Sequence, residues 1–207
     1  INYLSKYDII VFDFDGVLAN TLDLKSKILL EVYKKYGLDF QKKIFRYQKE
    51  IIGKSRIEKF RLIHNNILGI SITKKEVENL DNKFRTGMIF HLEKIKIYPK
   101  VKKILELLRY KKNKNIFCVS ASPINELSKI LKYNAMNEHF IKIYGAPTKK
   151  IESFKDIKKL TKSNYNSMLY IGDTKFDLSV AKEKNINFLG FGKNEKWSKN
   201  IDWIHRW

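Results

Sequence analysis

The sequence predicts an α/β protein with a doubly wound, mainly parallel five-stranded sheet and an all-helical unit inserted after the first strand. Two observations support this fold class. Beyond Pro99, short apolar runs alternate with segments of helical periodicity, which is typical of a parallel sheet with crossover helices. Between residues 20 and 90 the apolar residues recur at helical spacing alone.

The first strand is predicted at residues 8–13, an apolar run that ends in a carboxylate. Helical segments follow at 22–36, 40–52 and 57–68, each ended by a glycine. A fourth helix opens at Thr73, which forms a capping-box pattern with Glu76. We therefore expect a catalytic core from residues 1–19 and 92–207, and a helical cap from residues 20–91.

The second half of the chain supplies the other elements of the sheet layers. Helices are expected at 100–110, from Ser122-Pro123 onward, at 149–162 and at 175–184. They alternate with predicted strands at 115–119, 140–144, 168–171 and 187–191. The tail from residue 193 holds Trp197, Trp203 and Trp207, and we expect it to pack on the core.

Composition narrows the class of protein. Apolar residues make up 43% of the 207, enough for a packed core, and no run of about 18 uncharged apolar residues suggests a membrane span. The single cysteine, Cys118, and the lack of a secretory pattern favour a reducing, cytoplasmic setting. The net charge of +20 is spread along the chain, which favours compositional drift over a basic nucleic-acid surface, although the second interpretation remains an alternative.

Polar side chains gather at the predicted carboxyl ends of the strands, where parallel sheets bind ligands. These residues are Asp13 and Asp15, Ser120-Ala121-Ser122, the stretch 145–150, and Asp173 with Asp177. Four neighbouring carboxylates do not all stay ionised without a cation. Hard oxygen ligands and an expected phosphate substrate favour Mg²⁺.

The arrangement of these residues resembles the haloacid dehalogenase superfamily of phosphohydrolases. The segment DFDGVL at residues 13–18, followed by Thr21, is similar to that family's first motif. The later motifs are matched, in order, by Ser120, by Lys150, and by Gly172-Asp173 with Asp177. Each motif alone is weak, but the ordered set spans nearly the whole chain.

The resemblance implies a Rossmann-like core and a role for each matched residue. Asp13 would be the nucleophile that forms an aspartyl-phosphate, and Asp15 the acid and base. Mg²⁺ would be held by the Asp13 carboxylate, the Asp15 main-chain carbonyl and the Asp173 carboxylate. Ser120 and Lys150 would bind phosphoryl oxygens. Asp177 would fix the metal or hold Lys150, and Gly16 would allow a sharp turn.

Simpler structural roles also fit several of these residues. Ser120 and Ser122 are both placed to cap a helix, and Asp177 to act as a first-turn helix acid. Lys149 adjoins Lys150, and only one of the two is expected in the site. Cys118 is expected in the core, and structural roles are expected for His64, His91, His139 and His205.

The implied substrate is a small phosphorylated metabolite, and the oligomeric state is left open. An acid at Asp15 favours phosphate esters, because relatives that cleave carbon–halogen bonds or phosphonates lack it. A sugar phosphomutase keeps both aspartates and is the nearest alternative enzyme. In the cap, the polar loop containing Lys54, Ser55 and Arg56 is a hypothetical substrate-selecting element.

Overall fold

The structure is a computed structural model that describes residues 3–192 and 201–207. The chain forms two compact units. A core unit contains Ile1–Asn20 and Lys96–Trp207, and a helical unit contains Thr21–Ile95. Among the described residues no helix has the length and apolar character required to cross a membrane.

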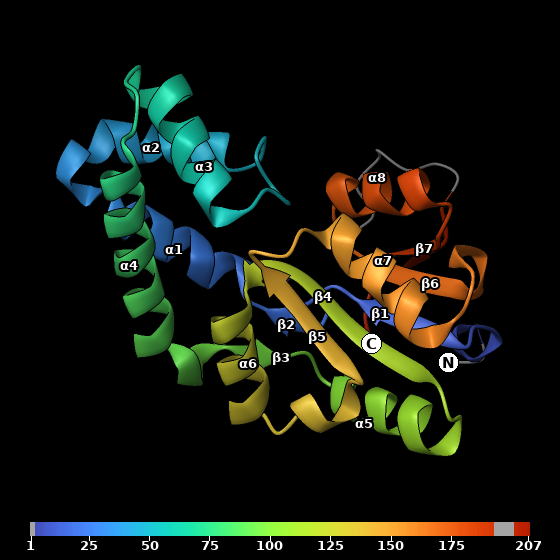
Figure 1. The fold of residues 1–207 in the computed structure, drawn as a ribbon. Coiled ribbons are helices and arrows are strands. Elements are labelled where there is room, and N and C mark those ends of the chain that lie inside the picture. The colour runs from blue at the N-terminus through green and yellow to red at the C-terminus, as the bar shows by residue number, and fades with distance from the viewer. Residues whose placement is uncertain (1–2, 193–200) are drawn as a thin grey trace. The chain divides into compact units, whose positions relative to one another are not determined.

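The core unit is built on one sheet of six parallel strands (Figure 1). Their order is β5-β4-β1-β6-β7-β8. The strands are β1 (Ile9–Phe12), β4 (Asn115–Pro123), β5 (Lys142–Ala146), β6 (Met168–Gly172), β7 (Asn187–Phe191) and β8 (Trp203–Ile204). The predicted fold class is confirmed, but the count of five strands was wrong because the tail adds β8 to the edge.

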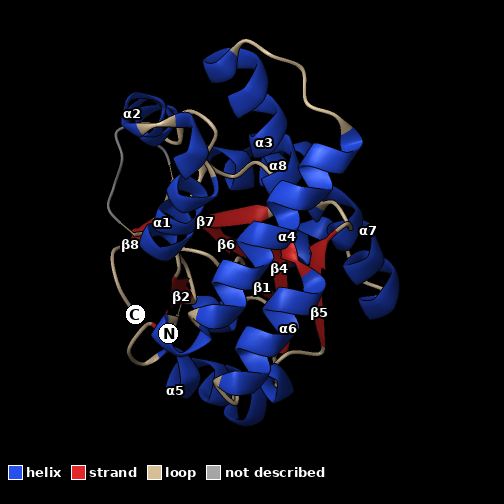
Figure 2. Ribbon diagram, turned by 90° about the vertical axis from the view of Figure 1, so that its left-hand side faces the viewer, coloured by secondary structure: helices blue, strands red, loops and turns tan. Residues whose placement is uncertain are grey.

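Helices cover both faces of this sheet (Figure 2). They are α5 (Val101–Glu106), α6 (Ile124–Tyr133), α7 (Lys150–Thr161) and α8 (Lys175–Lys184). The strand order runs outward in one direction from β1 to β5 and in the other from β6 to β7. Right-handed crossovers therefore place α5 and α6 on one face and α7 and α8 on the other. Because both faces are covered, all four residues of β1 are buried.

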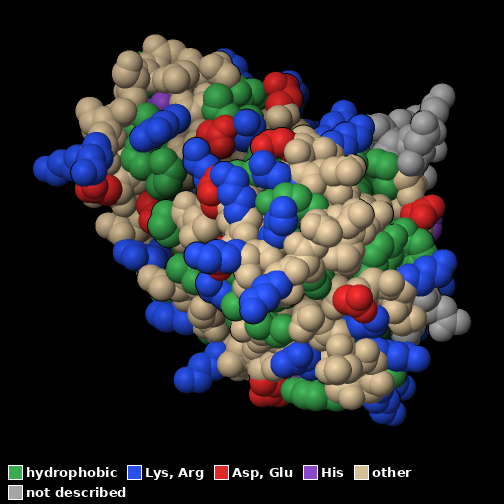
Figure 3. All heavy atoms as spheres, turned by 45° about the vertical axis from the view of Figure 1, so that its right-hand side comes forward, with side chains coloured by type: hydrophobic (Ala, Val, Ile, Leu, Met, Phe, Trp, Pro, Cys, Tyr) green, Lys and Arg blue, Asp and Glu red, His purple; other side chains and the backbone are tan. Residues whose placement is uncertain are grey.

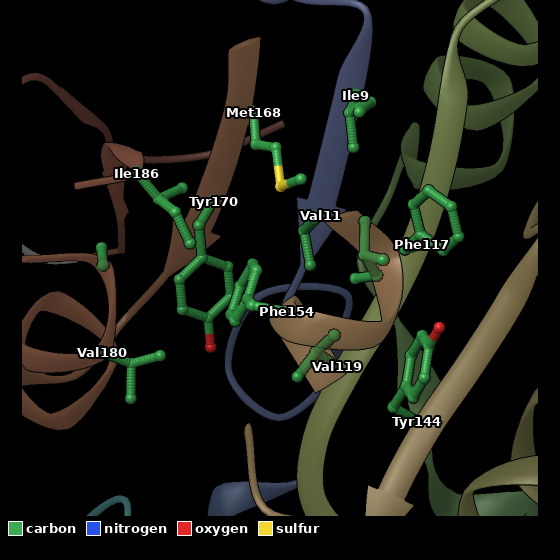
Figure 4. Packing of buried hydrophobic residues seen from close by; sticks show 12 residues of the cluster. Ile9, Val11, Phe117, Val119, Tyr144, Phe154, Met168, Tyr170, Val180 and Ile186 are labelled. Atoms are coloured by element: carbon green, nitrogen blue, oxygen red, sulfur yellow. The ribbon is translucent and has the colours of Figure 1, made fainter. Parts of the chain in front are cut away.

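The core beneath α7 and α8 consists of apolar side chains from four strands and both helices. Figure 4 shows Val11 of β1 and Phe117 of β4 with Phe154 of α7 and Tyr170 of β6 among the packed residues. Each of these four side chains is almost completely buried. Removing this apolar surface from water at about 25 cal/mol per Å² is the main term that holds the layers together.

The chain leaves and re-enters the core unit through a small antiparallel pair. Strand β2 (Ala19–Asn20) pairs with β3 (Lys96–Ile97). Further short helical turns lie at η1 (Leu4–Lys6), η2 (Lys34–Tyr36), η3 (His64–Leu68), η4 (Leu92–Lys94), η5 (Leu107–Lys111), η6 (Asn137–His139) and η7 (Tyr165–Ser167). Because the chain leaves and re-enters the core unit at this one strand pair, the helical unit is inserted without interrupting the sheet.

The helical unit contains α1 (Leu22–Val32), α2 (Leu38–Tyr47), α3 (Arg56–Ile63) and α4 (Lys74–Phe90). The predicted capping box is confirmed at the start of α4. Thr73 Oγ1 accepts from the Glu76 amide at 3.3 Å, and Glu76 accepts from the Thr73 amide at 2.8 Å. Tyr33, Phe60 and Phe84 are buried in this unit. The periodic apolar residues therefore form a separate small core.

The tail packs on the core unit, as predicted. The Trp207 indole N–H donates to the Val17 carbonyl at 2.6 Å, and its ring stacks on Phe191 with 4.8 Å between centroids. Trp203 lies in β8. Trp197 lies outside the described residues. These contacts fix the last residue beside β7 and the turn that follows β1.

Candidate active site

Asp13 is the first residue after β1 and is nearly buried, with 4% of its surface exposed. Its amide donates to the Ile171 carbonyl at 2.9 Å, and its Oδ1 accepts from the Phe14 amide at 2.8 Å. The chain then turns at Gly16, whose φ is +81°. Asp13 and Asp15 thus lie in a turn beyond β1, which ends at Phe12, one residue before the predicted end of the strand.

Lys150 is the first residue of α7 and extends its buried side chain to three oxygen atoms. Its Nζ lies 3.1 Å from Asp13 Oδ1, 2.6 Å from Asp177 Oδ1 and 3.1 Å from the Tyr170 hydroxyl. An ammonium has three N–H donors, so each of them is engaged. Lys149 is exposed at the N-cap. Of the two adjacent lysines, Lys150 is therefore the one in the cluster.

Asp177 holds the other side of this ion pair. Its Oδ1 accepts from Lys150 and from the Tyr170 hydroxyl, at 2.6 and 2.5 Å. Its Oδ2 accepts from the amide and hydroxyl of Thr174, at 3.1 and 2.5 Å. A carboxylate offers about four acceptor positions, so Asp177 is saturated. Burial alone would raise the pKa of Asp177, but Lys150 and these hydrogen bonds outweigh it and lower the pKa.

Asp173 follows β6 and faces the same cluster. Carboxylate oxygens of Asp13, Asp173 and Asp177 all lie within 4.8 Å of one another. Among the described residues, Asp173 Oδ1 is the one buried carboxylate oxygen without a hydrogen-bond partner. Burial, then the charges of Asp13 and Asp177, raise the pKa of Asp173. A Cβ at Gly16 would lie 2.1 Å from Asp173 Oδ2, so the close approach requires glycine there.

The cluster has more negative charge than Lys150 balances. Burial raises the pKa of Asp13 to about 7; the Lys150 ammonium opposes that rise, and the charges of Asp177 and Asp15 add to it. The free oxygen of Asp173 and the neighbouring Asp13 offer hard ligands to a divalent cation. Asp177 has no acceptor position left, so the residues fit the metal set predicted from Asp13 and Asp173, with Asp177 holding Lys150.

Asp15 stands apart from the three clustered carboxylates. Its Oδ2 accepts from the Ser122 hydroxyl at 2.7 Å and from the Ser120 hydroxyl at 3.2 Å. The Ser122 amide donates to Ser120 Oγ at 3.1 Å, with Ala121 half-buried between them in β4. The predicted helix start at Ser122 was wrong, because β4 continues to Pro123 and α6 begins at Ile124.

Two residues of this arrangement were not predicted for it: Tyr170 and Thr174. Ser122 was predicted at this end of the sheet, but its hydrogen bond to Asp15 was not. Thr174 could have been found, because Thr174 and Asp177 have capping-box spacing and do form that motif. Strand alternation predicts only that Tyr170 faces one side of the sheet. No pattern in the sequence predicts that its hydroxyl meets a lysine from α7.

The residues suggested for substrate selection all have partners inside the helical unit. Lys54 pairs with Glu58 at 2.8 Å, and Ser55 caps α3 by accepting from the Glu58 amide at 3.3 Å. Arg56 pairs with Asp81 at 3.0 Å and lies over the Phe84 ring at 4.2 Å. Thr21 is buried just before α1 in the same unit. Their role towards a substrate stays a prediction.

The residues for which structural roles were predicted lie outside the acidic cluster. Cys118 is buried in β4, as predicted, and the three-carboxylate cluster contains no histidine. His64 lies 3.1 Å from the Tyr33 hydroxyl and 3.0 Å from the Phe60 carbonyl.

A separate cavity of about 1140 Å³ lies beside α5 and the tail, lined by residues such as Leu107 and Trp203. Asp13, Lys150 and Asp173 do not line it, so it is distinct from the acidic cluster.

Comparison with known proteins identifies the family. Residues 10–191 match the family model described as haloacid dehalogenase-like hydrolase. This match covers most of the chain, so the protein belongs to that family of enzymes. No curated protein matches the sequence at a significant level.

Solved structures share the fold at low sequence identity. A β-phosphoglucomutase from Clostridium difficile has a TM-score of 0.81 at 20% identity, covering 97% of this chain and 91% of that one. A predicted phosphoglycolate phosphatase from Haemophilus somnus 129pt has a TM-score of 0.77 at 16% identity, covering 97% and 95%. A haloacid dehalogenase-like family protein from Streptococcus pneumoniae has a TM-score of 0.73 at 19% identity, covering 97% and 94%.

Proposed function

We propose that this protein is a Mg²⁺-dependent phosphohydrolase that cleaves small phosphate monoesters through an aspartyl-phosphate on Asp13. One observation carries the proposal: the buried Asp13 carboxylate contacts a lysine and lies close to a second carboxylate, Asp173, that has an unpartnered oxygen. Asp13 touches Lys150 at 3.1 Å, and Asp173 Oδ1 has no partner among the described residues. A divalent cation supplies the positive charge that this arrangement lacks, and that cation would in turn attract a phosphate ester anion to Asp13.

The reaction has two steps. A carboxylate oxygen of Asp13 attacks phosphorus, the bond from phosphorus to the ester oxygen breaks, and Asp15 gives that oxygen its proton. Asp15 then takes a proton from water, which attacks phosphorus and releases inorganic phosphate and free Asp13. The hydrogen bond from the Ser122 hydroxyl to Asp15 Oδ2 orients this carboxyl for both transfers.

Lys150 and the metal would both offset negative charge at Asp13. Lys150 is held by Asp177 and stabilises negative charge that develops on phosphoryl oxygens. On substrate binding, the Ser120 hydroxyl would exchange its hydrogen bond to Asp15 for one to the same oxygens. Asp13, the Asp15 main-chain carbonyl and Asp173 would hold Mg²⁺, which reduces repulsion between the anionic nucleophile and the anionic substrate.

The helical unit is proposed to act as a cap that excludes water and selects the leaving group. The loop with Lys54, Ser55 and Arg56 remains the candidate selecting element. Because all three residues have partners within the unit, substrate binding would exchange those contacts for new ones. A covered site favours small phosphorylated metabolites over macromolecules. The similar structures include a predicted phosphoglycolate phosphatase and a β-phosphoglucomutase. Both names refer to small phosphorylated substrates, which supports this substrate class.

A direct experiment is release of phosphate from p-nitrophenyl phosphate and from a panel of phosphorylated metabolites, with Mg²⁺ or with EDTA. Wild-type protein should release phosphate only with Mg²⁺, and Asp13→Asn should reduce release to background. Release by Asp13→Asn at the wild-type rate would contradict the proposal. A phosphomutase would instead move phosphate between positions of a hexose phosphate with little net release.

The face of the molecule seen in Figure 3 does not favour the nucleic-acid alternative. On that face, lysine and arginine side chains are interspersed with apolar and acidic ones rather than gathered into one patch. A protein that used its +20 charge in this way would bind oligonucleotides with a steep dependence on salt. Weak binding with a shallow salt dependence would remove that alternative.

A further inference from the structure

The Tyr170 hydroxyl lies inside the ion pair of the proposed catalytic site. It accepts a hydrogen bond from Lys150 Nζ at 3.1 Å and donates one to Asp177 Oδ1 at 2.5 Å. We propose that Tyr170 is a positioning residue that holds the Lys150 ammonium in place for phosphoryl transfer. This inference rests on the proposed function and deepens it.

The hydrogen-bond count supports this role. Lys150 has three donors and three oxygen partners, and the Tyr170 hydroxyl is the only uncharged one among them. A third carboxylate in its place would satisfy the donor but add another negative charge beside the incoming phosphate. The neutral hydroxyl satisfies the same donor and leaves the positive charge of Lys150 less cancelled.

The Tyr170 hydroxyl also completes the set of hydrogen bonds that Asp177 accepts. With Tyr170, Lys150 and Thr174 as donors, Asp177 accepts four hydrogen bonds. Without the hydroxyl, Asp177 Oδ1 and one Lys150 donor would both lose a partner in a buried site. The Lys150 ammonium would then keep two of its three contacts and would sample other positions.

The ring of Tyr170 is rigidly placed. It is fully buried, and its centroid lies 4.9 Å from that of Phe154, edge-on (Figure 4). The centroid of Phe188 lies 5.9 Å away, also edge-on. Burial, then the charges of Asp177 and Asp13, raise the pKa of Tyr170 well above its ordinary value. The hydroxyl therefore keeps its proton and remains a donor to Asp177.

The test compares Tyr170→Phe with Tyr144→Phe. Both tyrosines belong to the same buried core, and each gives its hydroxyl to a carboxylate. Tyr144 donates to Asp156 at 2.7 Å, and Asp156 pairs with the exposed Lys142, outside the acidic cluster. Each substitution keeps the ring and removes one hydroxyl, so Tyr144→Phe is the control for loss of a tyrosine hydroxyl in the same core but outside the acidic cluster.

We expect Tyr170→Phe to lower kcat about tenfold, the loss of one hydrogen bond to a charged group, with KM within about twofold. Inhibition by orthovanadate, which resembles the transferring phosphoryl group, should weaken by about the same factor as kcat/KM. The Mg²⁺ concentration for half-activation should not change. Tyr144→Phe should match wild type in all three measurements.

The outcomes separate the two proposals. If wild-type protein releases no phosphate from any ester with Mg²⁺, the proposed function fails and the role of Tyr170 fails with it. If wild type is active and Tyr170→Phe has the wild-type kcat and vanadate inhibition, only the role of Tyr170 is overturned. A lower melting temperature with unchanged kinetics also overturns that role, because it marks a purely structural hydroxyl. Should Tyr170→Phe not fold, Tyr170→His keeps a polar ring at this position and is judged by the same measurements.

Discussion

Each of the two units contains a nearly buried cation, and the surroundings of the two differ. In the core unit, Lys150 contacts Asp13 and Asp177, whose side chains are 6% and 0% exposed. In the helical unit, Arg56 is 9% exposed and pairs with Asp81, which is 28% exposed. Arg56 also lies over the Phe84 ring, whereas Lys150 belongs to a cluster that contains the unpartnered Asp173 oxygen.

The difference shows how a structural ion pair is distinguished from a functional one. Asp81 keeps contact with water, and an aromatic face supports Arg56, so that pair is stable without any further group. The carboxylates around Lys150 are buried and outnumber it, which costs free energy unless another cation is bound. An imbalance of buried charge is therefore the stronger indication of a ligand site.

The largest expected contrast comes from Lys150→Met and Arg56→Met, which remove the charge and keep an apolar stem. Lys150→Met should lower phosphatase activity by about 10² to 10³-fold, because it removes charge stabilisation at the phosphoryl group. It should also lower the free energy of unfolding by about 3–5 kcal/mol, since buried carboxylates lose their partner. Colorimetric phosphate release measures the activity, and urea unfolding measures the free energy of unfolding.

Arg56→Met is the matched variant in the helical unit. Because Asp81 is partly solvated, the loss of the pair should cost about 1 kcal/mol. If Arg56 also selects substrate, KM for the preferred ester should rise while kcat with p-nitrophenyl phosphate is kept. An unchanged KM for that ester would exclude Arg56 from the selecting element. If Arg56→Met lost as much free energy of unfolding as Lys150→Met, the proposed difference between the two cations would be wrong.

The pH dependence of stability provides the next test. Asp13 has a pKa of about 7 in the folded protein, above its ordinary value of 3.8. At pH values between these two, the folded state therefore binds a proton at Asp13 more tightly than the unfolded state does. Metal-free protein should therefore lose stability as the pH rises from about 4 through 7. Mg²⁺ should raise the melting temperature more at pH 8 than at pH 5.5.

An equal Mg²⁺ effect on melting at the two pH values would show that the ion binds elsewhere. The helical unit provides an internal contrast, because Glu76, in the capping box, has its pKa lowered by hydrogen bonds from Thr73. Its contribution is present above the ordinary pKa of glutamate and is lost as the pH falls, which is the opposite sign. Melting curves recorded with EDTA from pH 4 to 8 test the direction for Asp13.

The smallest effect is expected from the two capping boxes. Thr73→Ala and Thr174→Ala each remove one N-cap hydroxyl and should each cost about 1 kcal/mol of stability. Thr174→Ala should in addition reduce activity several-fold, because Asp177 loses a hydrogen bond from Thr174 Oγ1 and holds Lys150 less firmly. Equal activity in the two variants would show that Asp177 is positioned without its cap.

The sequence predicted those features that depend on local pattern. The alternation of apolar runs and helices predicted the parallel sheet, and the ordered strand-end residues predicted that Asp13, Lys150, Asp173 and Asp177 share one region. The spacing of Thr73 and Glu76 predicted a helix start to the residue. In each case the pattern itself lies within a few positions along the chain, and the rule that parallel strands end at one edge of a sheet brings the separate patterns together.

Features that depend on packing between distant segments were not predicted. Strand β8 forms only because the tail returns to pair with β7, so the count of strands was too low. Ser122 was expected to cap a helix, but β4 extends through it and its hydroxyl meets Asp15, which is 107 residues away. Tyr170 meets Lys150 across the packing of β6 and α7, which has no local signature.

The central claim is that Asp13 and Asp173 share a divalent cation beside the nucleophile. Calorimetric titration of metal-free protein with Mg²⁺ at pH 7.5, compared between wild type and Asp173→Asn, tests it most directly. One bound Mg²⁺ per chain in wild type, and a loss of at least about a hundredfold in affinity in Asp173→Asn, is the predicted result. The same affinity in both proteins would contradict the claim.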